Sequence, residues 1–474
     1  MPKYAGVLPL ADTTVDLARL QFATTSIYHF LFVPLTLGLT PLVAVMQTLW
    51  HRTGDERWYR LTRFFGTLML INFAIGVATG IVQEFQFGMN WSTYSKTVGD
   101  VFGAPLAMEG LAAFFLESTF IGLWIFGRDR LSPRVHLATI WLVVLGTWLS
   151  STFILIANSW MQHPTGYKIN PATGRPVMDS ITKVFGNEWA WWAVAHTLLA
   201  ALMTGAFLVL GVAAWHLLRQ HEAAAFRLAA KLALIVAVPV TALNLGIGSE
   251  FGVIITEQQP MKIASAEALW NTEKSASFSL FQIGGFSQSD PDPSFSIEIP
   301  GLLSFLATNS FNGTVEGLNQ VNADEQAQYG PGNYIPDVHL TYWSIRIMAY
   351  AGSLSLLVAL LGWLLWRRGR FDTTRWYLRL AIGAIALPFI SSAAGWVFTE
   401  AGRQPWAVQG LLKTADAVTP SLTTGQAIFS LAVFISLYLA LGVTDFWLMR
   451  RYARRDLPDA APPAEAEPEP VLRY

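Results

Sequence analysis

Cysteine and charge are what this 474-residue sequence has least of. It contains no cysteine, which excludes disulfide bonds, iron–sulfur clusters, thiolate metal sites and covalently attached haem of the c type. Only 13% of its residues are charged, about half the share of a typical soluble domain, and the net charge is -1. Without a basic surplus, binding to nucleic acid is not expected. Any metal must be held by His, Met or carboxylate side chains.

Apolar residues make up 53% of the chain, and they form nine long runs. Runs of about 20 residues match the thickness of a bilayer, so the sequence predicts an all-α bundle of nine transmembrane helices. We expect them at about 20–50, 63–86, 104–127, 133–158, 189–219, 228–256, 340–366, 376–399 and 425–450. The chain then divides into helices one to six (1–256), a large loop (257–340), helices seven to nine (341–450) and a disordered tail (451–474) rich in Pro, Ala and Glu.

Lys and Arg gather in every second connection between these helices, beginning with the connection after the first. Because basic loops stay in the cytoplasm, we expect the N-terminus outside and the C-terminus inside. The loop 257–340 is then extracytoplasmic, and its apolar patches favour a folded lid over a tether.

Four side chains able to bind iron lie inside predicted helices: His29, His196, Met348 and Glu400. With the predicted orientation and a rise of about 1.5 Å per residue, all four fall in the outer third of the membrane. Taken singly, a helix histidine is more often a hydrogen-bonded interface residue, and a methionine more often fills a gap. Together, His196 and Met348 suit the two axial positions of a low-spin haem. Five other histidines sit at helix ends, where we expect them to be solvated: His51, His136, His216, His221 and His339.

Two carboxylates, Glu109 and Glu117, interrupt the apolar third helix. Eight residues separate them by roughly 12 Å along the axis, and Ser118 and Ser150 could bridge them through water. One glutamate alone could equally be an interhelical hydrogen-bonding group. Two favour a proton relay, with Glu109 nearer the outside.

Three arginines, Arg19, Arg346 and Arg403, form a further set. Buried arginines want bidentate anionic partners, and haem propionates would supply them. Snorkelling to lipid headgroups is the alternative for Arg19. Arg403 follows Glu400 by one turn, so a structural ion pair is the alternative there.

Six motifs resemble subunit I of the cytochrome bd quinol oxidases. They are RLQF with YHFLFVP (19–34), NFAIGVATG (72–80), EFQFG (84–88), FGAPLAMEG (102–110), ANSWMQ (157–162) and GRQPW (402–406). The resemblance implies an enzyme that oxidises quinol at the outer face and reduces O2 to water with cytoplasmic protons, generating proton motive force without pumping. It also implies two b haems, one low-spin and one high-spin, and one haem d.

By the same resemblance, His196 and Met348 would hold the low-spin haem b, His29 haem d and Glu400 the high-spin haem b. The remaining roles follow the family too: Glu109 beside haem d, Glu117 on the proton path, Trp396 between haems, and Lys262 and Glu267 near the quinol. Expected partners are subunit II, small accessory subunits, ubiquinol or menaquinol, O2 and the bacterial cell membrane. The loop 257–340 is similar to that of the short-loop subgroup, and without cysteine its bracing must come from packing or a partner chain.

Two other classes of membrane protein are alternatives to an oxidase. A membrane anchor that passes electrons through haem b needs a His/Met pair but has no use for His29, Glu400 and Glu109 together. A secondary transporter would show helices broken by Gly or Pro and a repeat between halves. Neither feature is evident in the sequence.

Overall fold

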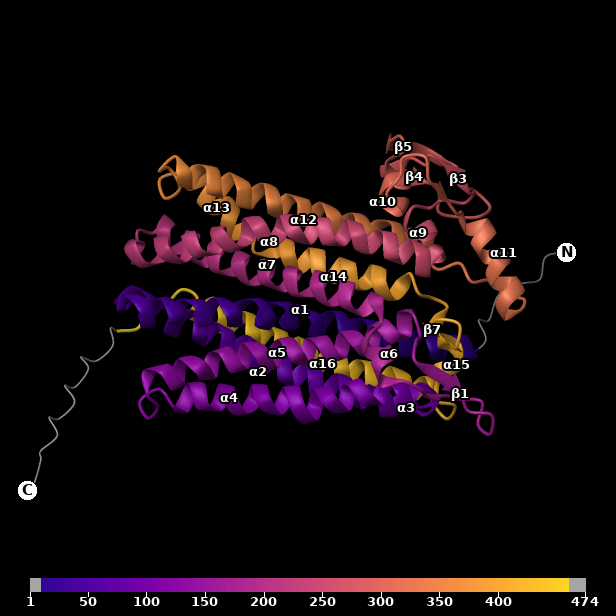
Figure 1. Cartoon of the computed structure of the whole chain (residues 1–474), viewed down its shortest axis with the longest axis horizontal. Helices are drawn as coiled ribbons and strands as arrows, with labels where there is room; N and C mark the ends of the chain where they lie inside the picture. The colour runs from indigo at the N-terminus through magenta and orange to yellow at the C-terminus, as the bar shows by residue number, and fades with distance from the viewer. Residues whose placement is uncertain (1–9, 460–474) are drawn as a thin grey trace, which may run out of the picture.

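Nine long apolar spans form the body of the described part of the chain, as the apolar runs predict. The computed structural model describes residues 10–459, with side chains from Thr13 onward. Seven of the spans are single helices that lie side by side along the long axis (Figure 1). They are α1 (Leu10–Thr53), α2 (Glu56–Met89), α5 (Pro133–Gln162), α7 (Glu188–Leu218), α8 (Ala223–Gln258), α12 (Val338–Arg367) and α16 (Thr424–Tyr452).

The third and eighth spans are interrupted. The third consists of α3 (Ser92–Met108), a π-helical turn η1 (Glu109–Phe114) and α4 (Phe115–Phe126). The eighth consists of α13 (Arg375–Gly383) and α14 (Ala386–Ala401). Both spans occur where the sequence predicts them, but the apolar runs gave no sign of these interruptions. A π turn inside an α-helix frequently marks a functional site, and this one begins at Glu109.

The apolar core lies where α1, α2, α7 and α8 pack together. A close approach of α1 to α7 depends on Gly38 and Gly205, because a Cβ atom at either position would overlap the backbone of the opposite helix. Small residues at helix crossings in membranes allow this kind of contact.

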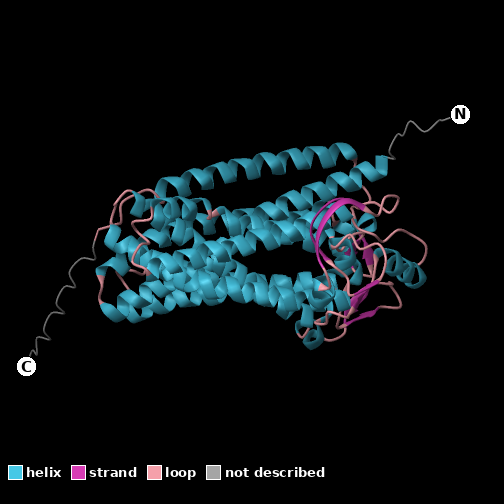
Figure 2. Ribbon diagram, turned by 90° about the horizontal axis from the view of Figure 1, so that it is seen from above, coloured by secondary structure: helices cyan, strands magenta, loops and turns pink. Residues whose placement is uncertain are grey.

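The shorter elements gather at one end of the bundle, where most strands are seen (Figures 1 and 2). Most lie in the segment 259–337: α9 (Pro260–Ala266), β3 (Glu273–Lys274), β4 (Phe278–Gly284), β5 (Pro293–Ile299), α10 (Leu302–Thr308), β6 (Thr314–Val315) and α11 (Leu318–Tyr329). Here β4 pairs with β5 and β3 with β6, both antiparallel. The others are β1 (Tyr167–Ile169), β2 (Pro176–Met178), α6 (Ile181–Phe185), β7 (Trp406–Val408), β8 (Leu412–Lys413) and α15 (Thr414–Ala417).

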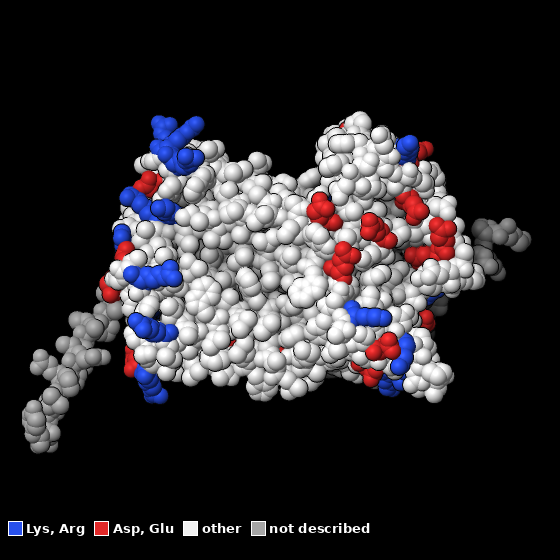
Figure 3. All heavy atoms as spheres, in the orientation of Figure 1, with Lys and Arg blue, Asp and Glu red and all other residues white. Residues whose placement is uncertain are grey.

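The two ends of the bundle differ in charge. Figure 3 shows Lys and Arg gathered at the end opposite the strand-rich segment, with acidic residues prominent near that segment. The start of α1 and the end of α16 lie at opposite ends of the bundle, as an odd number of spans requires (Figure 1). This distribution is consistent with the predicted orientation, which stays a prediction.

Two sequence expectations need correction at the basic end. The chain does not lose its structure at residue 451, because α16 continues to Tyr452 and Leu457 is buried in the core. The rest of the predicted tail, 460–474, lies outside the described residues. His136 and His216 are buried rather than solvated, because their ring nitrogens bond to backbone carbonyls of Trp124 and Ala453.

Candidate haem and quinol sites

His29 of α1 is held by Thr79 of α2. Its Nδ1 lies 2.9 Å from the Thr79 hydroxyl, whose single proton is already directed at the carbonyls of Ile75 and Gly76. The imidazole Nδ1–H therefore donates to the Thr79 oxygen, and Nε2 carries the free lone pair. Fixing one ring nitrogen in this way is how proteins orient a metal-binding histidine. The ring also lies against Gly80, where a Cβ atom would be 3.0 Å from its Cε1.

His196 of α7 has an unmet bonding requirement. Its Nδ1 is buried and has no hydrogen-bond partner among the described residues. The ring packs on Gly248 of α8, where a Cβ atom would lie 3.0 Å from its Cε1. Buried polar atoms are nearly always paired, so an orphaned imidazole nitrogen fits a site that a metal would complete.

Met348 of α12 faces Gly395 of α14 in the same way. A Cβ atom at Gly395 would lie 2.7 Å from the Met348 sulfur, so only glycine leaves room for the thioether. Ser391 of α14 donates to the Met348 carbonyl at 2.8 Å and fixes the two helices together. Because α8 packs on both α7 and α12, the helices that carry His196 and Met348 share a neighbour.

Glu400 closes α14 within a dense polar network. One of its oxygens accepts from Asn158 at 2.9 Å and from Gln162 at 3.3 Å, and the other pairs with Arg403 at 2.5 Å. Arg403 is 6% exposed, and its Nη1 is buried without a partner among the described residues. The ion pair weighed as an alternative is thus present, while the free Nη1 can still donate to a propionate.

Lys262 of α9 joins the same network through Gln162. Its ammonium donates to the Gln162 side-chain oxygen at 2.6 Å, while the Gln162 amide donates to Glu400. Lys262 is 1% exposed, and burial, with the nearby charge of Arg403, lowers its pKa well below the usual value. Two hydrogen bonds therefore connect a predicted iron ligand to a predicted quinol residue.

Glu267, the other predicted quinol residue, is paired with Arg346. Their side chains are 5% and 1% exposed, and Nη2 lies 2.7 Å from the carboxylate. Burial raises the pKa of Glu267, and the adjacent guanidinium partly offsets this rise. The other Arg346 N–H groups donate to carbonyls of Ala266, Ser279 and Tyr342. Since its five donors are all used, the structure does not support the predicted propionate role for Arg346.

The predicted proton residues are only partly brought together. Ser150 of α5 donates to Glu109 at 2.7 Å, a direct bond where a water bridge was expected. Ser118 instead donates to Phe114 of its own helix and takes no part in a bridge. Glu117 is 7% exposed and packs against Gly146 of α5.

Trp396 and Arg19 have contrasting surroundings. Trp396 of α14 stacks on Phe30 of α1, the residue after His29, with ring centroids 5.0 Å apart. Arg19 is exposed and lies 3.6 Å from Asp16 at the start of α1. It does not join the buried network, which favours the snorkelling alternative.

Several residues that contact the candidate ligands could not be assigned a role from the sequence. Thr79, Asn158 and Gln162 lie in two of the six family motifs, but their hydrogen bonds depend on contacts between helices that are distant in sequence. Nothing in the sequence indicates that Gly80, Gly248 and Gly395 pack against the candidate ligands. An aromatic cluster was also missed, in which Trp406 stacks on Tyr334 at 5.6 Å and Lys413 lies over both rings.

The ligands are spread out rather than clustered. Among residues 13–459, no three His, Cys, Asp or Glu side chains could together hold a metal ion. Haem iron is held by single axial ligands such as His and Met, and a free arginine N–H group can bind a haem propionate. The donor set therefore fits haem.

Comparison with known proteins decides the family. A profile of cytochrome bd terminal oxidase subunit I matches residues 17–457. The chain belongs to this family. It is 45% identical to the cytochrome bd ubiquinol oxidase subunit 1 of Bacillus subtilis, covering 93% of both chains. It is 39% identical to the cytochrome bd-II ubiquinol oxidase subunit 1 of Escherichia coli, covering 93% of this chain and 96% of that one.

The fold agrees with this assignment. The bd oxidase structure from Geobacillus thermodenitrificans superimposes with a TM-score of 0.85 at 28% identity, covering 94% of this chain and 99% of the other. This cytochrome bd subunit I is thus a multi-pass bacterial membrane protein of a terminal quinol oxidase, with haem cofactors and quinol as substrate. The transporter and simple-anchor alternatives are not supported.

Proposed function

We propose that this chain is the haem-bearing subunit that oxidises quinol at the outer face and reduces O2 to water with cytoplasmic protons, without pumping. The observation that carries the proposal is the bridge through Gln162 between Lys262 and Glu400. This bridge supports the proposal because it connects Lys262, which is expected to meet quinol, to Glu400, which is expected to hold a haem. Two b haems and one haem d, when bound, would supply the electron transfer and the oxygen chemistry.

Each ligand has a role in this proposal. His196 and Met348 would hold the low-spin haem b, His29 haem d, and Glu400 the high-spin haem b. Arg403 would direct its free Nη1 to a propionate, while its Nη2 keeps Glu400 in place and its Nε donates to the Trp406 carbonyl. Trp396, stacked on Phe30, would fill the space between the haems held from α1 and α14.

Lys262 and Glu267 would handle the protons of quinol. The lowered pKa of Lys262 brings its Nζ closer to neutrality, so it can accept a proton and release it again. Glu267 has a raised pKa and can hold a proton in turn. Both lie in or next to α9, in the segment proposed to be the extracytoplasmic quinol-binding loop, so these protons would leave to the outside.

Glu109 and Glu117 would deliver protons for oxygen reduction. The bond from Ser150 fixes the Glu109 carboxylate beside the π turn, and Glu117 follows deeper in the same span. Protons would pass from the cytoplasm by way of Glu117 to Glu109. Subunit II, and small accessory subunits, would cover exposed apolar helix faces.

Replacement of the axial ligands tests the proposal. Assembled oxidase with His196→Ala or Met348→Ala should lose the low-spin haem signal in reduced-minus-oxidised spectra and lose quinol oxidation with it. His51→Ala, which changes an exposed histidine at the basic end, is the control and should keep both. Normal low-spin spectra in the His196 and Met348 variants would overturn the ligand assignment.

Proton stoichiometry tests the second part. In liposomes, the oxidase should release no more protons outside than the number of electrons it transfers, because quinol oxidation alone supplies them. A larger yield would show a pump and contradict the proposal.

A further inference from the structure

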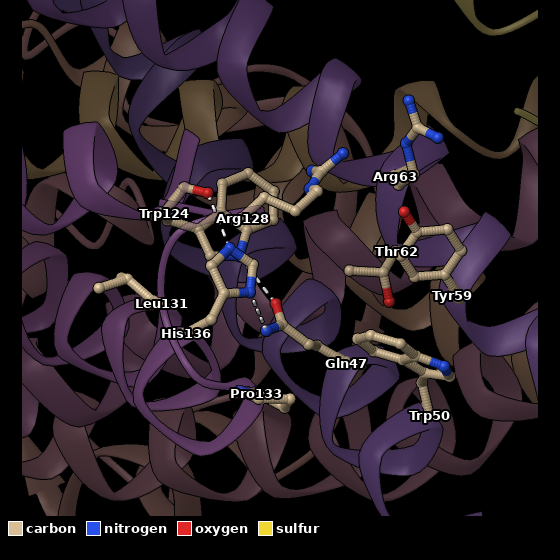
Figure 4. A pocket seen from close by; sticks show the side chains of 10 residues that line it. All are labelled: Gln47, Trp50, Tyr59, Thr62, Arg63, Trp124, Arg128, Leu131, Pro133 and His136. Carbon is tan, nitrogen blue, oxygen red and sulfur yellow. Dashed lines mark hydrogen bonds between the residues drawn. The ribbon is translucent and has the colours of Figure 1, made fainter. Parts of the chain in front are cut away.

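A pocket at the basic end of the bundle has no part in the proposed oxidase chemistry. It lies between the end of α1, the beginning of α2, the connection after α4 and the beginning of α5 (Figure 4). Its volume is about 60 Å³. Since a single water needs about 10–15 Å³ by this measure, the pocket has room for a group the size of phosphate.

Two arginines at this pocket lack a counterion. Arg63 lies 5.8 Å from the ring centre of Tyr59, and Arg128 lies 6.0 Å from that of Trp124. Neither guanidinium forms an ion pair with a carboxylate of residues 13–459, although the exposed Asp129 adjoins Arg128. Burial lowers the pKa of Arg128; Tyr59 and Asp129 partly offset this effect, and the positive charge of Arg63 adds to it. Two partly buried cations that repel each other are suited to a shared anion.

The floor of the pocket is rigid and fully bonded. The Trp124 indole N–H donates to the Gln47 oxygen at 2.7 Å, which fixes the orientation of that amide. Its NH2 group therefore donates to His136 Nδ1 at 2.9 Å, and His136 Nε2–H donates to the Trp124 carbonyl at 2.9 Å. Figure 4 shows this network beneath the two guanidinium groups. The polar atoms of the floor are thus satisfied by each other, which leaves the arginines to bind a ligand.

Exposed apolar side chains lie close to the pocket in sequence, among exposed charged residues of the connection after α4. Phe126, two residues before Arg128, is 76% exposed, and Val135, near the start of α5, is 51% exposed. A free phosphate would make no use of these side chains, whereas the acyl chains of a lipid would cover them. Aromatic rings beside basic groups at helix ends are also typical of the membrane interface.

We propose that this pocket binds the phosphate of an anionic membrane lipid between Arg63 and Arg128, with its acyl chains along the exposed apolar side chains of α4 and α5. The site is separate from the haem and quinol residues, so its loss should leave the haem spectrum unchanged. The lipid class is defined by a net negative phosphodiester headgroup such as that of phosphatidylglycerol.

Binding to the purified, delipidated holo-oxidase tests the proposal. The probes are phosphatidylglycerol, phosphatidylcholine of the same chain length and inorganic phosphate, and bound lipid is counted by native mass spectrometry. Arg63→Gln with Arg128→Gln should weaken phosphatidylglycerol binding about tenfold, or about 1.4 kcal/mol. Arg130→Gln with Arg134→Gln is the matched control, because it removes two exposed charges from the connection after α4 and the start of α5. It should bind as the wild type does.

Other outcomes would overturn the proposal. If the control loses as much affinity as the pocket variant, general charge and not the pocket attracts the lipid. If phosphatidylcholine or inorganic phosphate binds as tightly as phosphatidylglycerol, the site does not select an anionic lipid. Arg63→Lys with Arg128→Lys guards against misfolding, since it keeps the charge and should retain most of the binding.

Discussion

Replacing Glu267 by Leu should loosen the segment 259–337 from the bundle. Glu267 is the carboxylate partner of Arg346, whose side chain is 1% exposed, so the substitution leaves a buried guanidinium without its counterion. Removing one partner of a buried ion pair costs about 3–5 kcal/mol. The remaining Arg346 donors keep their backbone carbonyls, so we expect the lower end, about 3 kcal/mol.

Hydrogen exchange of the segment 259–337 is the assay. A loss of about 3 kcal/mol corresponds to roughly 100-fold faster exchange through local opening. Glu267→Gln should have a smaller effect, because its amide oxygen still accepts a hydrogen bond from Arg346. Glu273→Leu, which alters an exposed residue of β3, is the control. If Glu267→Leu exchanges no faster than Glu273→Leu, the ion pair does not hold the segment.

Three further predictions concern the buried sites. Gly395→Val should weaken or shift the low-spin haem signal by displacing the Met348 sulfur, whereas Gly383→Val, which has open space, should not. Lys262→Met should be more stable than wild type at pH 7, and thermal unfolding should show that advantage shrinking toward pH 10. Because burial lowers the pKa of Lys262, the free energy of unfolding of the wild type should rise as the pH approaches the usual pKa of lysine. A stability difference between the two proteins that stays constant with pH would contradict this lowered pKa. Ser150→Ala should slow oxygen consumption about tenfold, because Glu109 loses a hydrogen bond worth about 1.5–3 kcal/mol, while Ser118→Ala, measured in parallel, should have little effect.

The nine spans were predictable because the bilayer requires the same length and apolar composition of every helix that crosses it. A segment that crosses the bilayer must be long and apolar, and that pattern is visible without any tertiary information. The interruptions at η1 and between α13 and α14 leave the composition almost unchanged, so hydropathy could not reveal them. His136 and His216 were misjudged for a related reason, because burial at a helix end depends on the neighbouring segment.

The candidate ligands were predictable from residue type, but their surroundings were not. His29, His196, Met348 and Glu400 stand out because ionisable and thioether groups at membrane depth need a reason. The bridge from Lys262 through Gln162 to Glu400 forms only where the ends of α5 and α14 meet the start of α9. For Arg346 the residue type was misleading. It suggested a haem propionate as partner, whereas the guanidinium pairs with Glu267 and with backbone carbonyls.

The haem content of the assembled oxidase tests the central claim most directly. A dithionite-reduced spectrum of membranes containing this chain and its subunit II should show the bands of haem b together with a red-shifted chlorin band of haem d. A spectrum with haem b alone would reduce the protein to an electron-transferring anchor. A spectrum without haem would contradict the proposed function altogether.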